Sequence, residues 1–145
     1  MRILLATDGS AAADVALELV HSIPWPEESL IRVISVIEPT DGLLSGAWSP
    51  ALATDLEHQA DELLASATAT AEHAARQLER SGVAVEHEVI RGRSGSCIVE
   101  DATRFAADLI VMGSRGHGAL SSRLLGSVSA EVADHAPCPV LIARE

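Results

Sequence analysis

The sequence has 145 residues, a formal net charge of −11 and a pI near 4.8. A chain this acidic repels phosphate backbones, so we expect no nucleic-acid partner. This length predicts a single domain over 1–145. Hydrophobic residues make up 48% of the chain and aromatic residues only 2%, which predicts a core of Ala, Val, Leu and Ile. No apolar run reaches the roughly 18 residues of a membrane span. The two cysteines form no metal or disulfide motif, so we expect a cytoplasmic protein without a membrane partner.

The first half of the chain predicts two strands and two helices. The apolar run 3–6, closed by Thr7-Asp8-Gly9-Ser10, indicates a buried strand and a turn in which Asp8 or Ser10 caps a helix. A second, β-branched strand is predicted over 30–37. Residues 40–54 show no period and are expected to form a loop, whereas 55–80 predict a long amphipathic helix with an Ala-rich stripe.

The second half predicts three strands and two helices. Alternation over 83–90 indicates a strand near the sheet edge, followed by a glycine-containing turn over 91–96. We interpret that turn as Ser-capped and remote from the ligand edge of the sheet. A helix carrying Ile98, Ala102 and Phe105 on one face then leads to a very apolar strand over 109–112. Ser127 opens a last helix, and a final strand runs over 139–143.

Strands and helices therefore alternate along the whole chain. This alternation predicts an α/β fold, a doubly wound five-stranded parallel sheet with helices on both faces. In the strand order 3-2-1-4-5, the first and fourth strands are neighbours and the winding reverses between them. Ligands bind at the carboxyl ends of strands at such a point, so Asp8 and Gly113 are expected to face each other across a crevice.

The segment 113–127 reads Gly-Ser-Arg-Gly-His-Gly-Ala-Leu-Ser-Ser-Arg-Leu-Leu-Gly-Ser and is the strongest candidate for a ligand site. Its glycines allow close backbone approach, and Gly126-Ser127 precedes a helix whose first amides favour an anion. The stretch 109–130 contains no Asp or Glu, although roughly three would be expected by chance, and it holds Arg115, His117 and Arg123. A surface loop followed by a capped helix remains an alternative, because Walker A and G-x-G-x-x-G motifs are both absent.

The spacing of this segment resembles the G-x2-G-x9-G-[ST] nucleotide motif of the universal stress protein family, with Gly113, Gly116, Gly126 and Ser127 in place. The opening Ile-Leu-Leu-Ala-Thr-Asp-Gly-Ser, the stretch Val-Ile-Ser-Val-Ile-Glu-Pro and the ending Cys-Pro-Val-Leu-Ile-Ala-Arg resemble the same family. The resemblance covers the whole chain and implies a Rossmann-like fold of the adenine nucleotide alpha hydrolase type, in the branch that binds ATP. Ser35 departs from the family pattern, in which many members carry His at this position.

The resemblance implies a set of residues around ATP, with Mg²⁺ accompanying the nucleotide. Asp8 would contact the ribose or adenine, and the backbone of Val36 would hold the adenine. The glycine motif with Ser127, Val128 and Ser129 would surround the ribose and phosphates, and Arg115 and His117 could neutralise phosphate charge. The complete predicted set is Ala6, Thr7, Asp8, Val36, Met112, Gly113, Arg115, Gly116, His117, Gly126, Ser127, Val128 and Ser129.

Three functions follow from these residues and from the resemblance. The first is a nucleotide-dependent stress regulator that binds ATP and an unknown protein partner, as a homodimer paired through the last strand, Pro139 to Ala143. The second is an enzyme that slowly hydrolyses ATP or phosphorylates itself. No catalytic residue is assigned, because no general base is evident. The third is a dimerisation module without nucleotide. No metal site is predicted, because the histidines form no i, i+4 pair.

Overall fold

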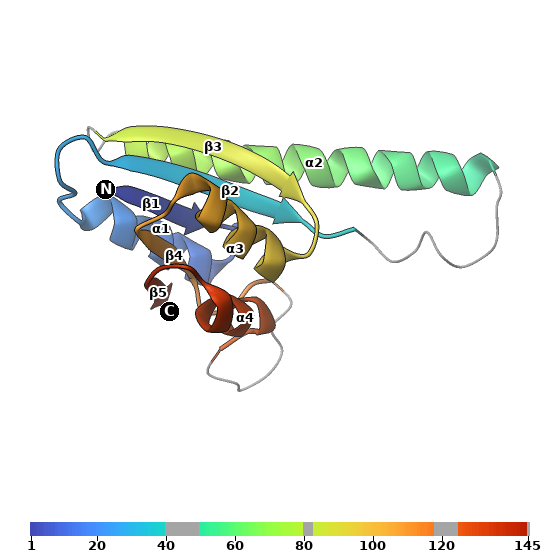
Figure 1. Cartoon of the computed structure of the whole chain (residues 1–145). Helices are drawn as coiled ribbons and strands as arrows, with labels where there is room; N and C mark the ends of the chain where they lie inside the picture. Colours follow the sequence, from blue (N-terminus) through green and yellow to red (C-terminus); the bar gives the residue numbers. More distant parts are fainter. Residues whose placement is uncertain (40–49, 80–82, 118–124, 145) are drawn as a thin grey trace.

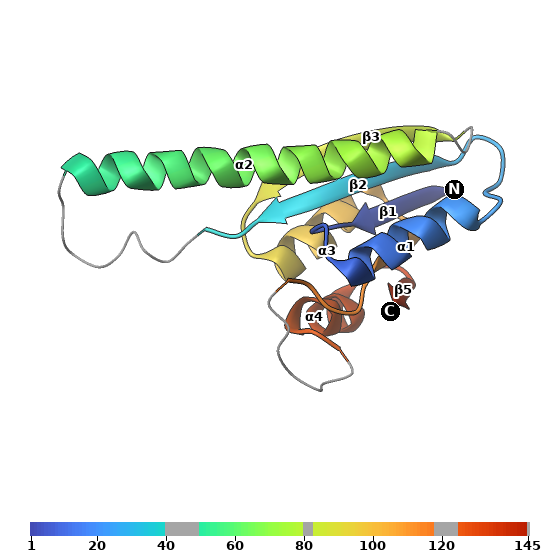
Figure 2. The same cartoon turned by 180° about the vertical axis from the view of Figure 1, so that it is seen from behind.

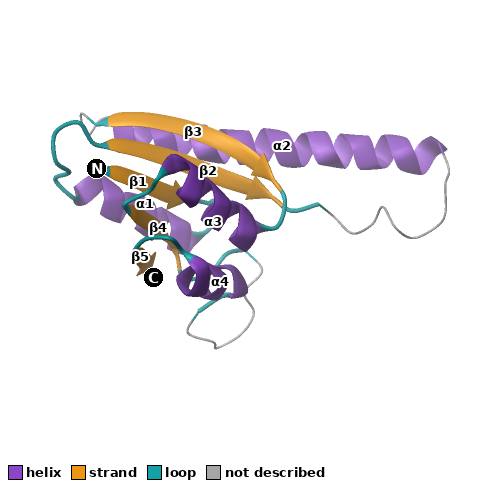
Figure 3. Cartoon of the chain, viewed as in Figure 1, coloured by secondary structure: helices purple, strands orange, loops and turns teal. Residues whose placement is uncertain are grey.

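The computed structural model describes residues 1–39, 50–79, 83–117 and 125–144. Five strands and four helices alternate in these ranges, as predicted (Figures 1 and 3). In chain order they are β1 (Arg2–Ala6), α1 (Ala11–Ser22), β2 (Leu30–Ile37), α2 (Pro50–Glu79), β3 (Ala84–Arg91), α3 (Ser94–Phe105), β4 (Leu109–Gly113), α4 (Ser127–His135) and β5 (Val140–Ala143).

The strands form one parallel sheet in the order β3-β2-β1-β4-β5, which confirms the predicted doubly wound topology. Helices α1 and α2 cover one face, and α3 and α4 cover the other (Figures 1 and 2). The register pairs Ala6 with Ile34 on one side and with Met112 on the other, so the ends of β1, β2 and β4 lie together. The segments that follow β1 and β4 at this edge of the sheet are the ones expected to bind the ligand.

Two apolar clusters hold the layers together. Successive residues of β1 serve opposite faces, because side chains alternate along a strand. Ile3 and Leu5 pack in the cluster under α1 and α2, whereas Leu4 and Ala6 pack in the cluster under α3 and α4. Trp25 packs at the border of the first cluster, and its indole N–H donates to the carbonyl of Val20 at 2.8 Å. Alanine is frequent in the helix faces, which lets the helices approach the sheet closely.

Helix α2 is longer than the sheet it covers and projects beyond it (Figures 1 and 2). It begins at Pro50, so the prediction of a loop up to Thr54 is wrong, and residues 40–49 lie outside the described part of the chain. The predicted stripe is buried only from Ala71 onward, and every described side chain over 57–66 is exposed. Leu63 is 44% exposed although its spacing predicts a buried position, because the sheet ends before this turn of the helix.

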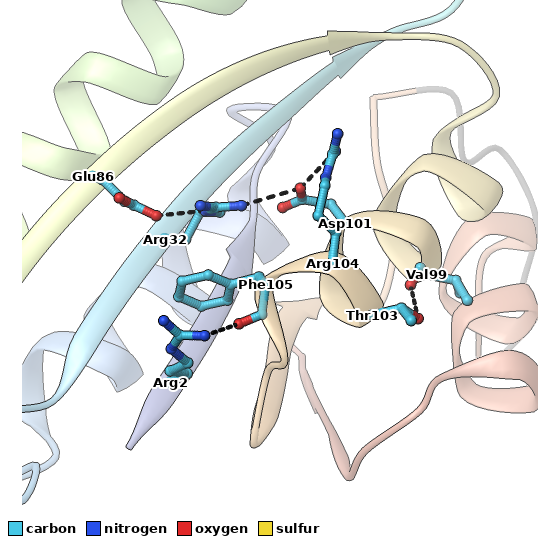
Figure 4. A network of polar contacts seen from close by, with 8 residues as sticks. All are labelled: Arg2, Arg32, Glu86, Val99, Asp101, Thr103, Arg104 and Phe105. Atoms are coloured by element: carbon cyan, nitrogen blue, oxygen red, sulfur yellow. Dashed lines mark hydrogen bonds and ion pairs between the residues drawn. The ribbon is translucent and has the colours of Figure 1, made fainter.

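A polar network connects the sheet to α3 (Figure 4). The carboxylate of Asp101 is fully buried, and its Oδ1 accepts hydrogen bonds from Arg32 at 3.2 Å and from Arg104 at 2.8 Å. Arg32 also pairs with Glu86 of β3 at 2.6 Å. The ring of Phe105 lies between the guanidinium groups of Arg2 and Arg32, at 5.2 and 4.3 Å from its centroid.

None of the helices within the described ranges is both long enough and apolar enough to cross a lipid bilayer.

Candidate nucleotide site

A cavity of about 980 Å³ opens at the carboxyl ends of β1, β2 and β4, where the topology predicts a ligand. All thirteen residues of the predicted set line it, so the fold brings together segments that are more than a hundred residues apart. Gly118 and Arg123, which belong to the same glycine-rich segment, lie outside the described residues. The cavity has a central floor and two chemically different sides.

The floor is the turn after β1. The amide of Gly9 donates to Thr7 Oγ1 at 3.2 Å, and the amide of Ser10 donates to Asp8 Oδ1 at 3.0 Å. Gly9 has φ of +75°, a left-handed conformation that glycine adopts without strain. Ser10 caps α1 by accepting from Ala13 N at 3.4 Å, so the predicted helix start is confirmed.

One side of the cavity is the loop after β4, which is hydrogen-bonded to Asp8 in the floor. The amide of His117 donates to Asp8 Oδ2 at 3.3 Å, and its Nε2 lies 2.9 Å from the carbonyl oxygen of Asp8. A Cβ on Gly116 would fall onto the carboxylate of Asp8. A Cβ on Gly113 would lie 2.7 Å from the backbone of Ala12. These two glycines of the motif therefore permit the loop to approach the first turn of α1.

The same side continues into the first turn of α4. The amide of Gly126 donates to the carbonyl of Ser114 at 2.8 Å, and Ser129 Oγ donates to the same oxygen at 2.9 Å. No side chain caps α4, so the amides of its first turn point toward the cavity without an intrahelical partner. We call the residues from Gly113 to His117 and from Gly126 to Ala130 the amide side. The helix dipole makes this side favourable for an anion.

The opposite side is apolar and is formed by Ile34 and Val36 of β2 with Ile98 of α3. These side chains belong to, or pack against, the cluster beneath α3 and α4. At the rim, the amide of Ser94 donates to Glu38 Oε1 at 2.9 Å. We call Ile34, Val36 and Ile98, together with the polar rim of Ser94 and Glu38, the apolar side. Hydrogen bonds from Ser94 lower the pKa of the Glu38 carboxyl below its usual value of 4.5. The stability they contribute is fully present above pH 4.5 and is lost as the pH falls through the lowered pKa of the folded state.

The turn over 91–96 was predicted to lie away from the site, and this prediction is wrong. Ser94 lines the cavity, and the residue at the N-cap position is Arg93, whose side chain makes no capping bond. The crossover from β3 to β4 must pass over β2 and β1, so α3 begins near the end of β2. Crossover geometry was the signal that could have placed Ser94 here.

Other lining residues were also absent from the prediction. Ser114 lies inside the motif itself, and its buried hydroxyl has no hydrogen-bond partner among the described residues. The full set of additional lining residues is Ala13, Ile34, Glu38, Ser94, Ile98, Ser114, Leu125 and Ala130. Five of them lie within two residues of a predicted one: Ile34, Glu38, Ser114, Leu125 and Ala130. The other three, Ala13, Ser94 and Ile98, belong to α1 and α3, from which no site residue was predicted.

Neither a metal cluster nor a reactive thiol is found near the cavity in the described ranges. No group of three or more His, Cys, Asp or Glu residues there is arranged to hold a metal ion. Burial, with the negative charges of Glu100 and Glu38, raises the pKa of the Cys97 thiol, and burial also raises that of Cys138. Both thiols are therefore weak nucleophiles near neutral pH.

Comparison with known proteins assigns the family. The profile of the universal stress protein family matches residues 1–144. The chain belongs to the universal stress protein family. A universal stress protein of Thermus aquaticus is 37% identical over 144 residues, covering 98% of this chain and 97% of the relative. Another, MJ0531 of Methanocaldococcus jannaschii, is 34% identical and covers 99% of this chain and 82% of its own length.

Solved structures share the fold. One is the universal stress protein UspA from Lactobacillus plantarum, with a TM-score of 0.83 at 26% identity, over 99% of this chain and 97% of its own. The hypothetical protein MJ0577 superposes with a TM-score of 0.86 at 26% identity, over 99% of this chain and 95% of its own. The sheet order 3-2-1-4-5 with four helices is therefore the adenine nucleotide alpha hydrolase-like fold of this family. Two more distant structures with the same fold carry nucleotides. One is a universal stress protein in complex with cAMP, at 24% identity and a TM-score of 0.69. The other is an Arabidopsis thaliana family member with AMP bound, at 19% identity and a TM-score of 0.68.

Proposed function

We propose that this universal stress protein binds ATP in the cavity and acts as a nucleotide-dependent regulator of the stress response. The observation that carries the proposal is the polarity of the cavity. An apolar side suited to a planar base faces an amide side suited to phosphates, and Asp8 lies on the floor between them. The adenine would lie against Val36 and Ile98, and the phosphates would meet the first turn of α4.

The local charge supports a phosphate ligand in a protein of net charge −11. The described part of the amide side carries Arg115 and His117 and no acidic residue. Backbone amides and a helix dipole hold anions without adding positive surface. Mg²⁺ commonly arrives with the nucleotide, bound to its phosphates. Relatives that bind cAMP and AMP support an adenine nucleotide as the ligand class.

A binding role is favoured over catalysis by the state of the two carboxylates at the cavity. Asp8 accepts backbone N–H groups on both oxygens, and Glu38 accepts one from Ser94. Each is therefore engaged in holding a loop, and neither is poised as a free general base. Slow hydrolysis or self-phosphorylation stays a second candidate, because several serine hydroxyls line the amide side.

We further propose a cytoplasmic homodimer that pairs through β5 and recognises a protein partner. Val140, Leu141 and Ile142 of β5 are only half-buried in the single chain. Pairing two copies along this edge would cover apolar side chains and free backbone groups. Cys97 and Cys138 are both free thiols, which suits a reducing compartment.

Calorimetric titration with ATP–Mg tests the proposal on nucleotide-stripped protein. Gly126→Asp adds a carboxylate at the start of α4, and Gly126→Asn adds a side chain of the same size without the charge. We expect binding by the wild type, partial loss in Gly126→Asn and abolition in Gly126→Asp, because the negative charge opposes phosphate. No binding by the wild type would reject the proposal and favour a nucleotide-free dimerisation module. Steady phosphate release by the wild type alone would favour the enzyme.

A further inference from the structure

Helices α3 and α4 form opposite walls of the cavity. They pack against each other in the apolar cluster beneath them, and one acidic side chain of α4 also links them through polar contacts. Ser94 and Ile98 of α3 line the apolar side, whereas the first turn of α4 lines the amide side. Between these two walls lies Glu131, which does not itself line the cavity. Its Oε2 accepts from Arg93 at 3.0 Å, and its Oε1 accepts from Ser96 at 3.3 Å.

The contact between Glu131 and α3 leaves no spare room. Gly95 is buried directly beneath the carboxylate, and a Cβ added there would collide with its Oε2. The first turn of α3 is therefore held from two directions. Glu38, the residue after β2, accepts a hydrogen bond from the amide of Ser94, and Glu131 of α4 accepts hydrogen bonds from Arg93 and Ser96. We call the contact of Glu131 with Arg93, Gly95 and Ser96 the α3–α4 clamp.

We propose that Glu131 is a positioning residue for the ligand, because the clamp sets the separation between the apolar side and the amide side. The inference rests on the proposed nucleotide function. A ligand that spans both sides needs their separation fixed in advance, since ordering a loose wall on binding lowers affinity. A ligand that fills the apolar side alone does not need it. The clamp should therefore matter for ATP and matter little for adenosine.

The exposure of the clamp separates this role from general stability. The side chains of Arg93 and Glu131 are 74% and 24% exposed. Ion pairs at such positions contribute little to the stability of the whole fold. Opening the clamp should leave the chain folded while it loosens one wall of the cavity. A loss that depends on ligand length then distinguishes positioning from partial unfolding.

The test compares ATP and adenosine binding to Glu131→Gln by calorimetry. Glu72→Gln is the matched control, because it also removes a carboxylate paired with an arginine, Arg76 at 3.2 Å, but on the exposed face of α2. We expect Glu131→Gln to weaken ATP roughly three- to tenfold and adenosine less than about twofold. Glu72→Gln should bind both ligands as the wild type does.

A second variant opens the clamp without changing charge. Gly95→Ala pushes the Glu131 carboxylate away, so it should show the same selective loss for ATP, with a circular dichroism spectrum like that of the wild type. Equal losses for ATP and adenosine in Glu131→Gln, or no loss for either, would overturn the inference while leaving the proposed function intact. Failure of the wild type to bind either ligand would instead reject the proposed function, and the inference with it.

Discussion

At the residue scale, Asp101 is the charged side chain that the described structure buries most completely. A buried carboxylate is tolerated only when its charge is compensated, and here Arg32 and Arg104 both donate to Oδ1. Arg104 comes from the solvent-facing surface of the same helix, whereas Arg32 comes from the sheet. Arg32 therefore links the carboxylate to β2, and through Glu86 to β3 (Figure 4).

Removal of Arg32 should be costly because it leaves the buried charge under-compensated. We expect Arg32→Met to lower the free energy of unfolding by about 3 kcal/mol, measured by urea denaturation. In Arg32→Met/Asp101→Leu the unpaired charge is gone, so the double variant should be more stable than the single one. A double variant less stable than Arg32→Met would show that the carboxylate stabilises the fold through other contacts.

Two glycines of the nucleotide motif have different physical reasons for being glycine. At Gly113 an added Cβ meets helix backbone of α1, which cannot move without shifting the helix. At Gly116 the obstacle is the side chain of Asp8, which can rotate. The first position therefore fixes how closely α1 approaches β4, and the second shapes the floor of the cavity. The same residue type therefore serves helix packing at Gly113 and the shape of the cavity at Gly116.

At the element scale, α2 divides into a packed half and a projecting half. From Ala71 to Leu78 its inner face lies on the sheet, whereas Leu63 and Leu64 are exposed on the projecting half. The two halves share one amphipathic pattern, so the sequence alone does not distinguish them. What separates them is the length of the strands beneath, because β2 and β3 are eight residues each and the helix is 30.

Equivalent leucine substitutions in the two halves should therefore differ in effect. Leu78 is fully buried, and Leu78→Ala should lower the free energy of unfolding by about 2–5 kcal/mol. Leu63→Ala removes a side chain that is already 44% exposed and should change it by less than about 0.5 kcal/mol. Chemical denaturation measures both. A large loss in Leu63→Ala would mean that the projecting half is packed in solution.

Much of this fold follows from local patterns in the chain. The strands could be predicted to within a residue or two. Four of them are β-branched or apolar runs bounded by Gly, Pro or a polar turn, and β3 shows alternation of apolar and polar residues. Alternation with helices predicted a parallel, doubly wound sheet, and the order 3-2-1-4-5 was one of the few topologies that right-handed crossovers permit. In α1, Ala13 and Leu17 are buried because the helix packs over β4 and β5 as well as β1.

The parts that could not be predicted depend on contacts between distant segments. The motif located the amide side of the cavity because its spacing is local. The apolar side needed the path of α3 over β2, and the α3–α4 clamp joins Arg93 to a residue 38 positions away. The sequence pattern does not indicate ion pairs such as Arg32 with Asp101, because each residue alone has the pattern of an ordinary surface charge.

At the scale of the whole molecule, the two edges of the sheet differ. The β3 edge carries Glu86 and Glu88, and charges of this kind discourage strand pairing. The β5 edge is apolar and short. The carbonyl of Pro139 accepts from Ile110 of β4, and that of Ala143 accepts from Ser114, the residue after β4. Because backbone groups alternate in direction along a strand, those of Val140 and Ile142 point outward.

This asymmetry makes the proposed dimer testable at one position. Ile142→Pro removes an outward N–H while leaving the bonds that Pro139 and Ala143 accept from Ile110 and Ser114, so we expect a folded monomer in analytical ultracentrifugation. Ile142→Val keeps the N–H and should remain dimeric. A folded Ile142→Pro protein that still sediments as a dimer would place the interface elsewhere.

The hydrogen bond between the Trp25 indole and Val20 gives the molecule a built-in optical reference. The chain has no tyrosine and only two tryptophans, so its ultraviolet emission comes from Trp25 and Trp48 alone. Trp25 is anchored at the border of the core, far along the chain from the nucleotide motif. A Trp48→Phe protein would therefore report unfolding through Trp25, and a Trp25→Phe protein would report events in the segment that follows Glu38. The same polypeptide can thus be read at two places without an attached dye.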